Sequence, residues 1–122
     1  MKEDTIRGLL RQWCDEYGIN PDTVHWCGYK DLSGNTMGEC WHRCEPYHYP
    51  WYFCEIYLDT KWKDKPLGWL ETSVLWHEMA HAIAYLEDGE PNGHDKRWKE
   101  LRDSKTKYMI GDWFAKFLFP IL

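Results

Sequence analysis

The sequence predicts one compact domain that contains both helices and strands. With 122 residues, the chain has the length of a single domain that can bury its own hydrophobic core. Two helical repeats of apolar residues and one alternating strand pattern between them predict its main elements. Because no linker, internal repeat or low-complexity segment divides them, residues 1–122 are expected to form one domain.

A first helix is expected over roughly residues 5–17. Asp4 and Thr5 can cap its start, and Gly18 can end it. The apolar residues between these signals recur at helical spacing: Ile6, Leu9, Leu10, Trp13 and Tyr17.

The middle of the chain contains the strand signals. Turns at residues 20–22 and 33–35 enclose residues 23–29, which predict at most a short strand. Residues 49–59 are β-branched or aromatic and alternate between two faces, so they predict the best strand of the chain. An extended substrate could pair with the edge of that strand.

A long helix is expected over residues 67–87. Asp64 and Pro66 mark its start, and Gly89 can end it. Its apolar residues surround the helix on nearly every side, which predicts a helix buried in the middle of the domain.

Two shorter segments follow the long helix. After a turn at residues 91–93, Asp95 can cap a helix that carries Trp98 and Leu101. The tail over residues 108–122 is apolar and is expected to cover the core or, alternatively, to dock on a protein partner or a membrane surface.

The composition of the chain limits which binding partners and which cellular compartment can be expected. The net charge of −5 gives no basic surface of the kind that non-specific nucleic-acid binding requires. The N-terminus lacks the apolar core of a signal peptide, and no run of about 20 apolar residues could span a membrane. A cytoplasmic protein is therefore expected.

The five cysteines favour free thiols or metal ligation over disulfides, because their number is odd and the chain has no export signal. Cys40 and Cys44 form a CxxxC pair, for which a second, structural zinc site and buried free thiols are the two interpretations.

The motif that predicts a metal-binding and catalytic role is His77-Glu78-Met79-Ala80-His81, an HExxH sequence on the long helix. Residues four apart stand on one helical face, so both imidazoles can bind one metal ion. Catalytic zinc sites hold the ion with three protein ligands and leave one position for water, from which a carboxylate takes a proton. His77 and His81 are thus predicted ligands, and Glu78 is the predicted general base.

The third ligand has to come from beyond the end of the helix. His94 fits this requirement, because Gly89 and the turn at 91–93 can bring the chain back toward the motif. Glu90, Asp95 and Glu100 are the alternatives, since oxygen also completes two-histidine zinc sites.

These residues resemble a known family. The stretch 77–82, followed by Gly93-His94 and Trp98-Lys99, is similar to the SprT-like (Spartan-related) zinc metallopeptidases, and residues 55–58 and 38–40 resemble the strand and the GxC segment of that family. The resemblance covers roughly residues 38–102. It implies a small zincin-like α+β domain in which the motif helix packs on a small antiparallel sheet.

The resemblance also implies an activity. A SprT-like domain would hold one zinc ion through His77, His81 and His94 and would hydrolyse peptide bonds of a protein or peptide substrate, with Glu78 as general base. The family acts on proteins bound to DNA, but the acidic composition here does not support a nucleic-acid partner. A chain this short would fit a stand-alone or phage-encoded member. The alternative is a non-catalytic module that zinc stabilises and that binds a protein partner.

Overall fold

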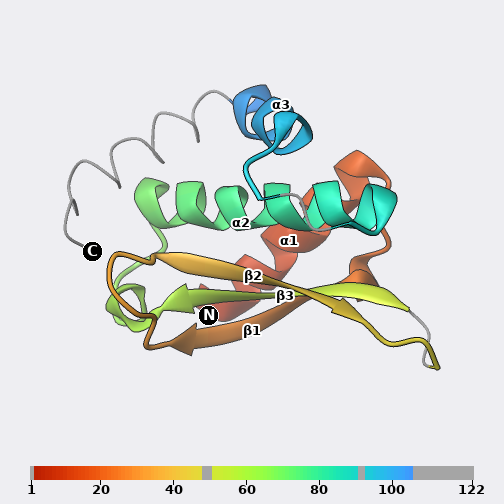
Figure 1. The fold of residues 1–122 in the computed structure, drawn as a ribbon. Helices are drawn as coiled ribbons and strands as arrows, with labels where there is room; N and C mark the ends of the chain where they lie inside the picture. Colours follow the sequence, from red (N-terminus) through yellow and green to blue (C-terminus); the bar gives the residue numbers. More distant parts are fainter. Residues whose placement is uncertain (1, 48–50, 91–92, 106–122) are drawn as a thin grey trace.

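The structure is a computed structural model that describes residues 2–47, 51–90 and 93–105 (Figure 1). The expected tail over residues 108–122 lies outside the described residues. None of the described helices is long and apolar enough to cross a membrane. In chain order the elements are α1 (Lys2–Tyr17), a 3-10 turn (Pro21–Thr23), β1 (Val24–Lys30), β2 (Gly38–Cys44), β3 (Tyr52–Asp59), a second 3-10 turn (Thr60–Trp62), α2 (Trp69–Asp88) and α3 (Lys96–Ser104).

The three strands form one sheet in the order β1-β3-β2. β1 runs parallel to β3 and β2 runs antiparallel to it. The α+β class is confirmed, but the expectation of an antiparallel sheet is wrong, because the sheet is mixed. β3 takes the central position because Cys54, Ile56 and Leu58 give it the most apolar inner face, and all three side chains are fully buried.

The strand β2 is not predicted by the sequence pattern. Its inner positions hold Gly38, Cys40 and His42, which are too small or too polar to produce a clear alternation. Its position at the edge of the sheet explains this composition, because an edge strand has one neighbour and buries less surface.

The helices cover one face of the sheet (Figure 1). α2 packs over β2 and β3, α1 packs over β1, and α3 lies against α2. α2 is buried along most of its length, which confirms the prediction of a central helix. Trp13 of α1 and Trp76 of α2 meet edge to face, with ring centroids 5.1 Å apart.

A buried carboxylate joins the start of α1 to the start of α2. Glu71 is 1% exposed and forms an ion pair with Lys2, whose Nζ lies 2.7 Å from Glu71 Oε1. The hydroxyl of Tyr29 donates to Glu71 Oε2 at 2.8 Å. Lys2 Nζ also donates to the carbonyl oxygens of Trp62 and Lys65, so one ammonium group ties three segments together.

Replacing Lys2 with methionine is expected to lower the free energy of unfolding by about 3 kcal/mol, because the change leaves the Glu71 charge buried without its cation. Urea unfolding followed by circular dichroism measures the loss. The double variant K2M/E71Q removes both charges and should recover a large part of it. A single variant as stable as the wild type would contradict this role of Lys2.

Candidate metal centre

Three histidines meet beside the middle of α2. His77 and His81 lie one turn apart on α2, and His94 comes from the segment between α2 and α3. One ligand nitrogen from each of the three lies within 4.8 Å of the others. Nε2 of His94 is 3.3 Å from Nε2 of His77. The structure therefore brings together the three residues that the sequence singles out as ligands.

The return of the chain to α2 depends on local signals. Gly89 ends α2 in the left-handed region at φ 75°, and its N–H donates to the carbonyl of Tyr85 at 2.7 Å. Asp95 caps α3 by accepting from the N–H of Trp98 at 3.0 Å, which confirms the predicted cap. His94 lies directly before this cap, so the start of α3 sets its position.

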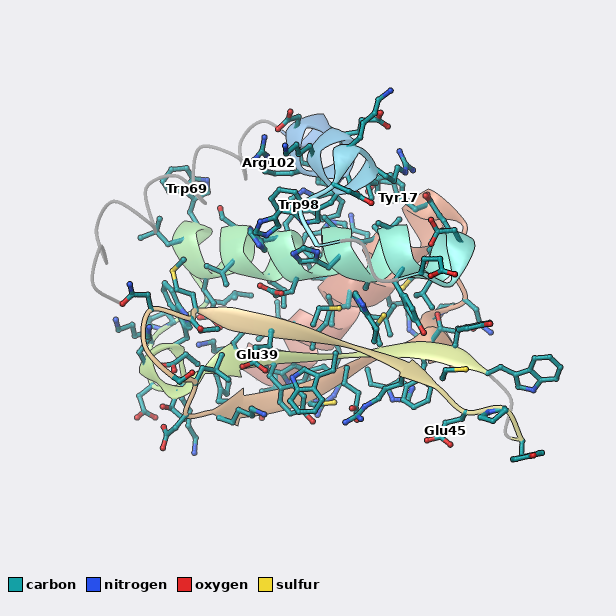
Figure 2. All side chains as sticks on the ribbon, viewed as in Figure 1. Tyr17, Glu39, Glu45, Trp69, Trp98 and Arg102 are labelled. Atoms are coloured by element: carbon teal, nitrogen blue, oxygen red, sulfur yellow. The ribbon has the colours of Figure 1, made fainter. Side chains whose placement is uncertain are left out.

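Trp98 forms the floor under the three histidines. Its ring centroid lies 4.2 Å from that of His94, 4.7 Å from that of His77 and 5.1 Å from that of His81. The indole N–H donates to the carbonyl oxygen of His77 at 3.2 Å. Figure 2 shows the side chain between α3 and α2. The sequence signal for this role is an aromatic residue one helical turn after His94.

The alternative third ligands are engaged elsewhere or lie apart from the cluster. The carboxylate of Asp95 caps α3, and that of Glu100 lies 3.5 Å from Arg97. Within the described part of the chain, His77, His81 and His94 are the only group with metal-site geometry. A second zinc site at Cys40 and Cys44 gains no support, and the five cysteines are free thiols.

Glu78 lies beside the cluster, next to the edge strand. Its side chain is buried, at 6% exposure. Gly38 of β2 lies so close that a Cβ at this position would be 3.1 Å from Cγ of Glu78 and 3.2 Å from the carbonyl oxygen of Tyr57. The absence of a side chain at Gly38 thus lets β2 pass close to the side chain of Glu78.

Two cavities flank the cluster and share Glu78 and His81 in their walls. The larger, of about 470 Å³, runs along residues 39–42 of β2 to Gly93, and the smaller, of about 310 Å³, includes residues 36–38, Val74, His77 and His94. We call the two cavities together the cleft. The cleft follows β2. The expectation that an extended substrate pairs with the edge of the strand over residues 49–59 is wrong, because this strand, β3, has a neighbouring strand on both sides.

Two residues that could assist a developing oxyanion point elsewhere. The hydroxyl of Tyr85 donates to the carbonyl oxygen of Arg43 at 2.9 Å, and burial raises the pKa of this phenol. Arg97 pairs with Glu87 at 2.6 Å. Neither residue lines the cleft. Tyr108 could have the same role but lies outside the described residues.

The donor set fits a zinc-type ion. Three imidazole nitrogens are the ligand set of open catalytic zinc sites, in which the fourth position is left for water or substrate. The rings of His77 and His94 stand nearly perpendicular, at 89°, so their nitrogens can approach one ion from different directions. The indole of Trp98 packs against all three imidazole rings.

Comparison with known proteins gives one match. The family model described as the SprT-like family matches residues 9–110. Neither the comparison with curated proteins nor that with solved structures gives a match. The match confirms the resemblance drawn from residues 38–102 and extends it in both directions.

Proposed function

The chain belongs to the SprT-like family, and from this membership we propose that it is a zinc-dependent metallopeptidase. The observation that carries the proposal is the position of Glu78. This buried carboxylate lines both cavities of the cleft and lies next to His77 in the sequence, on the helix that supplies two of the three clustered histidines. A carboxylate beside an open three-histidine site is suited to metal-assisted hydrolysis of an amide, because it can take a proton from the attacking water.

In this proposal His77, His81 and His94 hold the ion. When bound, zinc supplies Lewis-acid chemistry, which lowers the pKa of a water molecule to about 7 and polarises a carbonyl group. The carboxylate of Glu78 takes the proton of the attacking water and delivers it to the nitrogen of the leaving amine. Trp98 keeps the imidazole rings in place through its contacts with all three.

The edge of β2 is the element that would orient the substrate. Its outer side has no neighbouring strand in the described sheet, and the cleft runs along it. An extended polypeptide that adds to this edge would pass over Glu78 and the three histidines. Extended or unfolded segments are therefore the proposed substrates.

A second candidate function is a non-catalytic module that zinc stabilises. The observation in its favour is that His94 and Trp98 join α3 to α2, so that an ion at this place would also hold the two helices together. A purely structural site requires neither Glu78 nor a cleft beside the ion, and for this reason the peptidase is the better-supported proposal.

The test is the incubation of the zinc-loaded protein with a reduced and alkylated, unfolded protein, followed by mass spectrometry of the products. Cleavage at internal peptide bonds is expected, and a chelator should stop it until zinc is added back. If the protein binds a full equivalent of zinc but cleaves no internal peptide bond, the peptidase proposal is wrong and the non-catalytic module is supported instead.

The contact between Gly38 and Glu78 gives a further prediction. Gly38→Ala is expected to reduce the rate of cleavage by about 10- to 100-fold, because the added Cβ displaces either the catalytic carboxylate or the edge of β2. Zinc content should stay unchanged. Gly8→Ala is the matched control, since a Cβ at that helical position meets nothing within 4 Å. Equal rates for G38A and the wild type would show that the carboxylate does not depend on this contact.

A further inference from the structure

A separate cavity lies at the end of the domain where α1 and α2 both terminate. Its volume is about 470 Å³, and its walls include Gly18 and Ile19 after α1, Leu86 near the end of α2, and Trp51 and Tyr52 at the start of β3. Figure 1 shows the ends of α1 and α2 and the start of β3 at this same end of the molecule. None of its lining residues belongs to the cleft. We call it the end cavity.

Exposed aromatic side chains gather at the end cavity. Trp51 is 58% exposed and Tyr52 is 46% exposed, and both line it. Exposed aromatic side chains that cluster on a protein surface are typical of binding sites, because their burial against a partner is favourable. Ile19 and Leu86 add an aliphatic wall.

The electrostatics of the end cavity favour a cation. The C-terminal end of a helix carries a partial negative charge of about half a unit, and two such ends meet here. Neither α1 nor α2 has a basic residue in its last turn. Near these ends, Lys105 pairs with Glu16 and Arg97 pairs with Glu87.

Three further carboxylates lie within three positions in sequence of lining residues. These are Asp15 near the end of α1, Asp22 in the first 3-10 turn and Asp88 at the end of α2, and all three are exposed. None of the three forms an ion pair with a cation in the described parts of the chain.

We propose that the end cavity binds a basic segment of a partner polypeptide. A lysine or arginine side chain would lay its aliphatic stem against Ile19 and Leu86 and place its charge over the aromatic faces of Trp51 and Tyr52, near the helix ends. A second copy of this chain is the less suitable occupant, because the net charge of −5 makes two copies repel each other. This binding does not depend on the proposed hydrolysis.

The probe is a Gly/Ser peptide that carries four lysines, and its control is the same peptide with every lysine acetylated. Binding to the full chain is followed by NMR titration of the indole N–H signals, with mass spectrometry to check that the probe stays intact. The lysine peptide should shift the Trp51 signal, and high salt should weaken its binding. The acetylated peptide should bind at least about tenfold more weakly, since cation–π and charge attraction are lost.

Two variants and one control complete the test. Trp51→Ala should weaken binding of the lysine peptide at least about tenfold. Trp69→Ala, which removes a partly exposed tryptophan at the start of α2, outside both the end cavity and the cleft, should leave binding unchanged. The double variant D15N/D88N keeps the aromatic groups and should weaken binding several-fold, so the test survives if W51A does not fold. Equal binding of the two peptides, equal binding by W51A and W69A, or self-association that W51A abolishes would overturn the proposal.

Discussion

Replacing Glu78 with glutamine is expected to reduce kcat/KM for peptide-bond cleavage by about 10²- to 10⁴-fold while zinc content stays at one equivalent per chain. Glutamine keeps the size of the side chain, so the packing against Gly38 is preserved. The amide cannot accept the proton of the attacking water, and the reaction loses its general base. Steady-state cleavage of a fluorogenic peptide, together with metal analysis of the same sample, measures both quantities.

The matched control is Glu39→Gln, because Glu39 also lines the cleft but is not part of the motif. Its carboxylate accepts from the indole N–H of Trp41, and its loss should change kcat/KM only a few-fold. A Glu78 variant as active as the E39Q control would remove the general-base role from Glu78.

Replacing His94 with alanine is expected to weaken zinc binding by more than about 100-fold. Loss of groups that only support metal ligands costs about 10- to 100-fold in affinity, and the loss of a direct ligand should cost more. His94 Nε2 lies 3.3 Å from His77 Nε2, so its removal leaves only the two imidazoles of α2 for the ion. Competition with a chromophoric chelator measures the affinity.

His25→Ala serves as the control for this measurement. His25 is an exposed histidine on β1, and its Nε2 lies 2.8 Å from the carbonyl oxygen of Asp22, outside the metal centre. The variant should bind zinc like the wild type. Retention of a full equivalent at wild-type affinity by H94A would mean that another group completes the site.

Much of the helical structure and the proposed metal centre could be predicted from the sequence because the signals are local. The apolar residues of α2 and the stop at Gly89 lie within one segment, and the four-residue spacing of His77 and His81 places both on one face. His94 could be singled out because Gly89, Pro91 and Asn92-Gly93, which precede it, are sequence signals for a helix end and a turn.

The rest depends on contacts between distant segments, which no local pattern encodes. β2 lacks an apolar alternation because it is an edge strand, and its pairing with β3 comes from tertiary structure. The parallel pairing of β1 with β3 likewise joins segments that are far apart in the sequence. The contact between Gly38 and Glu78 joins residues 40 positions apart, so the cleft emerges only when the sheet and α2 have packed.

The most direct measurement of the proposed metal centre is X-ray absorption spectroscopy at the zinc edge of the zinc-loaded chain. Three histidine ligands with one open position predict imidazole scattering at Zn–N distances of about 2.0–2.1 Å and one further light atom from an exchangeable water. A Zn–S distance of about 2.3 Å, or a shell completed by a fourth protein ligand, would contradict an open three-histidine centre.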